Sequence, residues 1–305
     1  LEEVIAENLE KLFPGAAIEE YFLFRVTRNQ DLEIDEDETN EDLLLVMQEE
    51  LEKRRFGNVV RIEVENVQNE NLLLQLIDQF ETDNLQIYKV GAPLDLGALS
   101  ELCNIDRAEL KYPSFQPITH PHFSGVEDDD TDAFFAKIRE QETLLHHPYH
   151  SFSSSVGKFV ELAAKDPKVL AIKQTLYRTS GDSPIMHSLI DAAKRGKQVL
   201  AVIEIRARFD ETANVRWAQQ LEEAGVHVVY GILGLKTHAK ASLVVREENG
   251  ILRRYSHIGT GNYHPRTARM YEDLGLLSAD EVLGRDLSTL FNQLSGFAPE
   301  AEYVR

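Results

Sequence analysis

VLAIKQTLY (residues 169–177), QVLAVIEI (198–205) and VHVVY (226–230) are the stretches that decide the fold. Each is a nearly continuous apolar run of strand length, which is typical of strands covered on both faces. Between them lie two helical patterns, residues 183–195 and 211–224, each followed by a glycine. This β-α-β-α-β order predicts an α/β domain with a largely parallel central sheet.

Two arginines follow the first two of these strands. Arg178 comes directly after the first strand, and Arg208 lies three residues past the second. Ligands of such sheets bind beyond the carboxyl ends of the strands. Two arginines at equivalent positions there can form a shared anion site or can be ordinary surface residues, and the sequence favours neither interpretation over the other. Lys173 and Arg206 are competing candidates for this role.

A β-hairpin with a histidine near its start is predicted next. The sequence continues GLKTHAKASLVVREENG (234–250) and ILRRYSHIGTGN (251–262). Asn249-Gly250 is the strongest short hairpin signal, because both central residues of a type I′ turn need positive φ. A turn at this position sets a register in which Lys240 faces Gly259.

That register gathers the reactive side chains on one face of the hairpin. Because side chains alternate across a strand, the shared face carries His238, Lys240, Ser242, His257, Gly259 and Gly261. An imidazole and an ammonium group then project together opposite glycines, where a ligand can approach the backbone. On this register His257 lies about 13 Å along the strand from His238, at about 3.3 Å per residue, and is not its direct partner; a bulge in the glycine loop would change this.

His238 suits phosphoryl transfer. With an unperturbed pKa of about 6.5, most of the imidazole is neutral at about pH 7 and can attack phosphorus. The transition state concentrates negative charge, which cations such as Lys240, Arg178 and Arg208 stabilise. A lone histidine in a strand is more often structural, but the His-x-Lys spacing followed by a glycine loop favours a functional role.

The first half of the chain differs in composition. Residues 1–150 hold 12 of the 32 Lys and Arg residues but 34 of the 52 Asp and Glu residues, so the excess negative charge lies in this half. We therefore expect a phosphate-rich ligand to be repelled by the first half and accepted by the second half, whose charges nearly balance. An α+β domain is predicted, with helices at 2–12, 41–55, 70–80 and 94–103 and strands at 18–27, 59–65 and 85–90. The acidic runs Asp31–Asp42 and Glu127–Asp132 indicate solvated surface, and the second is the best candidate for a linker.

Several long, ordered motifs resemble polyphosphate kinase of the phosphohistidine type. They are HPYHSF (147–152), AIKQTLYR (171–178), ARFDE (207–211), GLKTHAK (234–240), HIGTGN (257–262) and TARMYED (267–273), with FLFRVTRN (22–29) and RRFG (54–57) in the first half. The resemblance covers essentially the whole chain. It implies an acidic α+β head domain over residues 1–124 and an α/β phospholipase D-like catalytic domain over 125–305, with the active histidine on the hairpin. A helical domain before the chain and a second phospholipase D-like domain after it are also expected.

The resemblance also implies roles for single residues. His238 matches the autophosphorylated histidine. Arg178 and Arg208 match positions associated with magnesium; since an arginine cannot ligate a cation, we expect both to hold phosphate oxygens that the metal also neutralises. The other matches are His257 as a second catalytic histidine, Lys240 as a catalytic cation, Asp273 as a partner orienting His238 or alternatively a surface carboxylate, Tyr271 as a nucleotide contact or alternatively a core aromatic, and Asn262 among the phosphate contacts.

The implied activity is reversible transfer of the terminal phosphoryl group of ATP to inorganic polyphosphate, with Mg²⁺ as cofactor. The implied partners are ATP, ADP, polyphosphate and a second copy of the chain bound through the head domain, without nucleic acid or a transmembrane segment. Cys103 is the only cysteine, which fits a reducing, cytoplasmic setting; peripheral membrane association stays open.

Two other functions compete with this one. They are a phospholipase D-like phosphodiesterase and a noncatalytic module for phosphate binding or oligomerisation. Val245 weighs against the phosphodiesterase, because the phospholipase D pattern has an orienting aspartate at that position; another carboxylate, such as that of Asp273, would then have to orient His238.

Overall fold

The computed structural model describes residues 2–29, 43–53, 56–65, 67, 69–82, 86–91, 93–178, 181–207, 210–231, 235–296 and 302–305. The chain forms two compact units, residues 1–40 with 49–113 and residues 41–48 with 114–305, and helix α3 (Leu43–Lys53) is divided between them. The acidic run Asp31–Asp42 lies outside the described residues. None of the described helices is long and apolar enough to cross a membrane.

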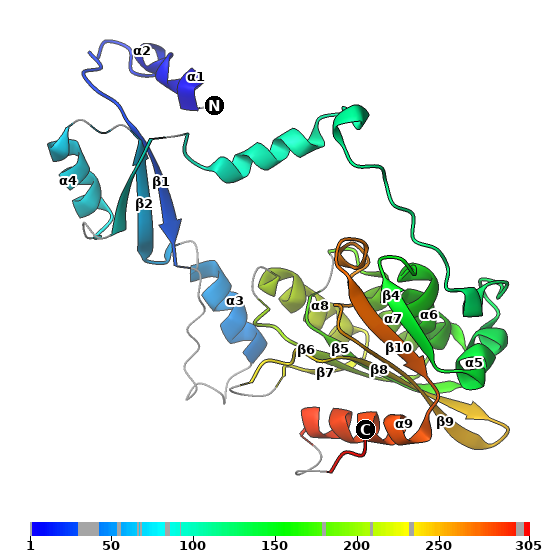
Figure 1. The fold of residues 1–305 in the computed structure, drawn as a ribbon. Helices are drawn as coiled ribbons and strands as arrows, with labels where there is room; N and C mark the ends of the chain where they lie inside the picture. Colours follow the sequence, from blue (N-terminus) through cyan, green and yellow to red (C-terminus); the bar gives the residue numbers. More distant parts are fainter. Residues whose placement is uncertain are drawn as a thin grey trace. The chain divides into compact units, whose positions relative to one another are not determined.

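The first unit is built on a three-stranded sheet (Figure 1). In it β1 (Leu23–Arg28) pairs antiparallel with β2 (Val59–Glu65), and β2 pairs parallel with β3 (Ile87–Val90). The apolar positions of β2 alternate, so they point to one side and pack against Leu76 of α4 (Glu70–Gln79). These elements confirm the α+β prediction for this half of the chain.

Three predicted boundaries in this unit were wrong. The strand predicted from residue 18 begins at Leu23, which pairs with Glu65, the last residue of β2. The helix predicted over 2–12 is divided into α1 (Glu2–Ala6) and α2 (Leu9–Leu12), because the Asn8 side chain donates to the Val4 carbonyl in place of a regular helical turn. The helix predicted over 94–103 begins two residues later and is a 3₁₀ helix, η4 (Leu96–Asn104).

The second unit is a seven-stranded sheet in the order β4-β10-β9-β8-β5-β6-β7 (Figure 1). Its strands are β4 (Thr143–His147), β5 (Val169–Leu176), β6 (Gln198–Ile203), β7 (His227–Val229), β8 (Lys240–Glu248), β9 (Ile251–Gly259) and β10 (Asp273–Ser278). The three strands β5, β6 and β7 run parallel and are joined by α7 (Pro184–Lys194) and α8 (Glu211–Glu223). The predicted β-α-β-α-β unit is therefore confirmed.

The prediction of a largely parallel sheet was wrong. Four of the six strand pairs in this sheet are antiparallel, because β8 returns beside β5, the hairpin reverses into β9, and β10 and β4 extend the sheet on that side. The hairpin register is confirmed from Lys240 to Glu248, but β8 begins at Lys240, so His238 lies before the hairpin strand rather than on it. Asn249 and Gly250 have φ of 54° and 79°, as a type I′ turn needs, and Lys240 pairs with Gly259.

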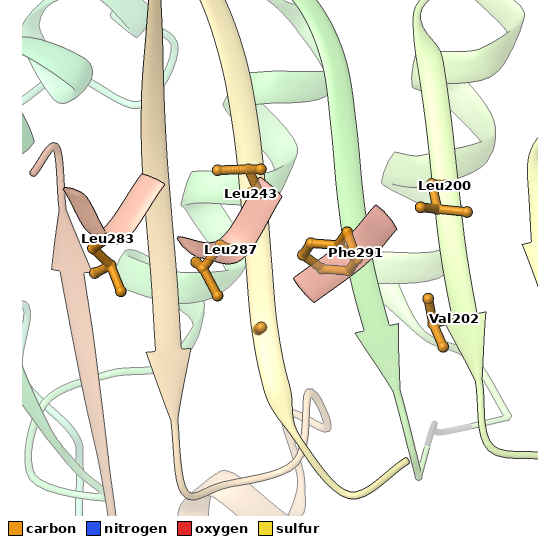
Figure 2. Packing of buried hydrophobic residues seen from close by; sticks show 7 residues of the cluster. Leu200, Val202, Leu243, Leu283, Leu287 and Phe291 are labelled. Atoms are coloured by element: carbon orange, nitrogen blue, oxygen red, sulfur yellow. The ribbon is translucent and has the colours of Figure 1, made fainter. Parts of the chain in front are cut away.

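Helices cover both faces of this sheet. α9 (Glu281–Leu294) lies on one face, while α5 (Thr131–Glu140), α6 (Lys158–Lys165), α7 and α8 lie on the other (Figure 1). The core under α9 comprises Leu200, Val202, Ala241, Leu243, Leu283, Leu287 and Phe291 (Figure 2). Because Ala241 and Leu243 face α9, the alternating Lys240 and Ser242 face the opposite side of the sheet.

Truncation of Phe291 tests the α9 core. Phe291 is fully buried against the sheet, so Phe291→Ala should lower the free energy of unfolding by about 3–5 kcal/mol, since it loses buried apolar surface and leaves a cavity. Leu252→Ala, at a position that is 55% exposed, should cost about 0.5 kcal/mol or less. Urea unfolding of the two variants measures both, and equal losses would contradict this packing.

Candidate active site

His238 lies in the segment that leads into β8, and β5 holds the backbone of that segment. The Thr175 hydroxyl donates to the Ala239 carbonyl (2.7 Å) and accepts from the Ala241 N–H (2.9 Å). Lys240 is only 6% exposed, and its Nζ donates to the His238 carbonyl (2.5 Å). The His238 side chain is exposed. An accessible imidazole therefore projects from a fixed backbone.

Tyr177 connects the two groups of the His-x-Lys motif. Its ring meets the His238 ring edge to face, with centroids 4.7 Å apart and an interplanar angle of 73°. The Lys240 Nζ lies 5.0 Å from the same ring centroid, within the range of a cation–π contact. Tyr177 thus supports the imidazole and the ammonium group together. Sequence reasoning gave it no role, although it directly follows β5 and precedes Arg178, where ligands of such sheets bind.

Positive charge surrounds the imidazole. Partial burial and the charges of Lys240 and Arg178 lower the pKa of His238. Burial also lowers the pKa of Lys240 to about 8; the Asp273 carboxylate opposes that shift and Arg178 adds to it. Arg178 Nε lies 3.4 Å from Asp210 Oδ2 at the start of α8. The site at neutral pH combines a neutral imidazole with cationic neighbours.

The glycine loop between β9 and β10 is closed by Asp273. The Thr260 hydroxyl donates to Asp273 Oδ1 (2.8 Å) and accepts from the Leu274 N–H (3.0 Å). A Cβ on Gly261 would lie 2.7 Å from the Asp273 carboxyl carbon. Only glycine fits at that position, and the carboxylate fixes the loop that faces Lys240.

His257 lies inside the sheet rather than at its surface. It is 3% exposed, and its Nδ1 is 2.7 Å from the Tyr263 hydroxyl. Its Nε2 has no hydrogen-bond partner among the described residues, and a Cβ on Gly275 would lie 2.7 Å from that atom. Burial lowers the pKa of His257 to about 3, with a smaller contribution from His147. The ring is neutral and packed behind the glycine loop.

The other predicted residues lie as follows. Tyr271 is 60% exposed after the short helix η8 (Thr267–Arg269), which removes the alternative of a core aromatic. Asn262 is partly exposed, and its Oδ1 is buried without a partner in the described structure. Arg208 lies outside the described residues. The Lys173 Nζ donates a hydrogen bond to Asn292 Oδ1 of α9 (2.9 Å), so Lys173 does not compete for the anion site.

Position 245 corrects one argument from the sequence. In β8, Val245 alternates onto the face of Ala241 and Leu243, which packs on α9. A carboxylate there would point away from the face that carries Lys240. The absence of an aspartate at this position therefore says nothing about how His238 is oriented.

The described residues contain no group of three or more His, Cys, Asp or Glu side chains placed to hold a metal ion. Arg178, which sequence resemblance associates with magnesium, is a cation and cannot be a ligand. The residues around His238 therefore suit the oxygens of a phosphate chain rather than a bare cation.

Comparison with known protein families gives two matches. Residues 1–102 match the family described as "Polyphosphate kinase middle domain", and residues 133–300 match "Polyphosphate kinase C-terminal domain 1".

Individual proteins agree with these matches. The chain is 55% identical over 305 residues to a polyphosphate kinase of Streptomyces coelicolor, covering 100% of the chain and 41% of that protein. It is 54% identical over 303 residues to one of Mycobacterium ulcerans, covering 99% and 41%. A crystal structure of the polyphosphate kinase of Porphyromonas gingivalis superposes with a TM-score of 0.77 at 26% identity, covering 100% of this chain and 42% of that one. The chain thus spans about two fifths of the length of these relatives.

The electrostatics predict how His238 titrates. Lys240→Met removes a positive neighbour, so the pKa of His238 should rise toward its ordinary value, as followed by NMR of the ring C–H. Lys236→Met removes the same charge from an exposed residue two positions before His238 and should leave that pKa unchanged. Equal shifts in both variants would contradict a specific Lys240–His238 interaction.

Burial of His257 predicts acid sensitivity. Its folded pKa is depressed to about 3, so the stabilisation from the neutral ring is complete above the unfolded pKa of about 6.5 and is lost as the pH falls through the range below it. His257→Asn should therefore show a shallower fall in unfolding free energy between about pH 6.5 and about pH 5. Leu252→Ala, which removes no titratable group and lies at a position that is 55% exposed, should keep the original slope; a common slope would refute the assignment.

Proposed function

Because this chain belongs to the polyphosphate kinase family, we propose that it carries the phosphohistidine site of such a kinase. A ring nitrogen of His238 attacks the γ-phosphorus of ATP, an N–P bond forms as the bond to the bridging oxygen breaks, and ADP leaves. A terminal oxygen of polyphosphate then attacks the phosphorus, the N–P bond breaks, and the chain is one unit longer. Both steps run in either direction.

The observation that carries this proposal is the exposed imidazole of His238 beside Lys240 and Arg178. Partial burial and these two cations lower its pKa, so the nucleophile stays neutral, and the cations can stabilise the negative charge of a transferring phosphoryl group. Lys240, with a pKa of about 8, remains mostly protonated at neutral pH. The same cations thus serve both the nucleophile and the transition state.

Magnesium fits this proposal as an ion bound to the nucleotide. The described residues offer no carboxylate cluster for it, so the phosphate oxygens of ATP supply its ligands and Arg178 contacts those oxygens from the protein side. Arg208 is proposed for the same role.

The other predicted residues take supporting roles in this proposal. Tyr271 has an exposed ring on which a nucleobase can stack, and Asn262 offers a side-chain amide beside the glycine loop. Asp273 orients the site through that loop by its bond to Thr260, and His257 supports the loop from within the sheet. The acidic first unit is proposed to mediate self-association.

Labelling with γ-phosphate-tagged ATP tests the proposal in the complete protein that carries this chain. The wild type should gain an acid-labile, base-stable phosphoryl group, and His238→Ala should lose it. Lys240→Met should slow labelling by about 100-fold, since one charge-stabilising group is lost. His187→Ala, which removes an exposed imidazole on α7, should label normally.

Absence of label from the wild type would overturn the kinase proposal. Cleavage of a simple phosphodiester that depends on His238 would then support the phosphodiesterase, and phosphate binding without either reaction would support the noncatalytic module.

A further inference from the structure

Glu204 is a buried carboxylate at the end of β6 that the proposed reaction does not use. It is 4% exposed, and each of its oxygens accepts a backbone hydrogen bond from a different loop. Oε2 accepts from the N–H of Thr237 (2.8 Å), the residue before His238. Oε1 accepts from the N–H of Arg206 (3.0 Å), in the loop after β6. One side chain therefore ties two of the loops at this edge of the sheet together.

Asn214 adds a third loop to this arrangement. It is fully buried on α8, and its Nδ2 donates to the carbonyl of Tyr177 (2.8 Å) and to the carbonyl of Glu204 (2.9 Å). Tyr177 contacts the His238 ring and precedes Arg178. The backbone N–H of Glu204 also donates to the Leu176 carbonyl (2.9 Å). The end of β5 is thus held to the same residue as the His238 segment.

The loop after β7 leaves space for these contacts. Gly231 has a φ of 70°, and a Cβ there would lie 3.3 Å from the Thr237 hydroxyl oxygen and 3.6 Å from Glu204 Oε2. A larger residue at this position would be strained in its backbone and would crowd the Glu204–Thr237 contact. The loops that follow three successive parallel strands therefore converge on one carboxylate.

We infer that Glu204 is a positioning residue for phosphoryl transfer: it fixes the backbone before His238 relative to the loops that follow β5 and β6. This inference rests on the proposed function. Phosphoryl transfer needs the nucleophile and the charge-stabilising groups in one geometry, and a misplacement of about 1 Å can cost about 100-fold in rate. A carboxylate whose two oxygens hold two backbone N–H groups supplies that geometry from behind the site, without touching the phosphate.

Glu204→Gln tests this role. The amide presents one oxygen and one NH₂ group, so one of the two N–H groups loses its acceptor and the loops are released from each other. Single-turnover labelling of the complete protein with γ-phosphate-tagged ATP should be about 10- to 100-fold slower at saturating ATP, with half-saturation changed less than about threefold. Glu204→Asp keeps both acceptor oxygens on a shorter stem and should recover part of the rate.

Asp286→Asn is the matched control. Asp286 is 8% exposed on α9, and its Oδ2 accepts from the N–H groups of Val304 (2.9 Å) and Arg305 (2.6 Å). It is a buried carboxylate bonded to two backbone N–H groups on the sheet face opposite Lys240. Both N–H groups share one oxygen, which the amide can still supply, so this variant neutralises a buried carboxylate away from the site and should label at the wild-type rate.

The outcomes separate the two proposals. An unlabelled wild type overturns the kinase proposal and this inference with it. A labelled wild type with Glu204→Gln at the wild-type rate overturns this inference alone, as does a loss of rate in Asp286→Asn equal to that in Glu204→Gln. If Glu204→Gln does not fold, Glu204→Asp decides: a slower rate at saturating ATP supports the positioning role, and a wild-type rate overturns it.

Discussion

The pairing of β8 with β5 on one side and β9 on the other is the constraint on which the site depends. It sets Lys240 opposite Gly259 and Ser242 between Gln174 and His257. Because the period of a strand is two, a slip of one residue would turn Lys240 into the apolar core under α9 and bring Ala241 to the site. The apolar contacts of α9 with Ala241 and Leu243 therefore specify the position of the ammonium group as firmly as they stabilise the sheet.

Depth within the sheet distinguishes the polar groups of the site. The face opposite α9 has an apolar core of its own under α5–α8, and it also holds a row of polar groups that becomes more buried with distance from His238. Lys240 is mostly buried, and His257 is completely enclosed beside Tyr263. Desolvation lowers the pKa of both groups, so the ammonium group holds its proton less tightly than in water and the inner imidazole stays neutral. Only His238 at the end of the row combines exposure with nearby positive charge.

The sequence predicted those parts of the molecule that local rules determine. The β-α-β-α-β unit follows from hydrophobic periodicity, and the hairpin register follows from one Asn-Gly turn and the period of a strand. The direction of β10 and β4 beside the hairpin depends on tertiary packing, so the sheet proved less parallel than predicted. Tyr177, Glu204 and Asn214 were missed for a related reason. Their contacts join residues from separate loops, and a buried glutamate has no local pattern that distinguishes it from a surface one.

The ion pair between Arg178 and Asp210 bears on how the phosphate site that we propose can exist in an acidic chain. Both side chains are about one-third exposed and their charged atoms are 3.4 Å apart, so the pair is of the partly solvated kind that contributes about 0–1 kcal/mol. A phosphate oxygen that takes the place of Asp210 would gain a charge-assisted contact with a guanidinium that is already in position. Asp273 acts similarly toward Lys240, since its charge raises a pKa that burial lowers. In the proposed function, a phosphate oxygen replaces these carboxylates beside the cations, which would allow a chain with a net charge of −20 to bind a polyanion.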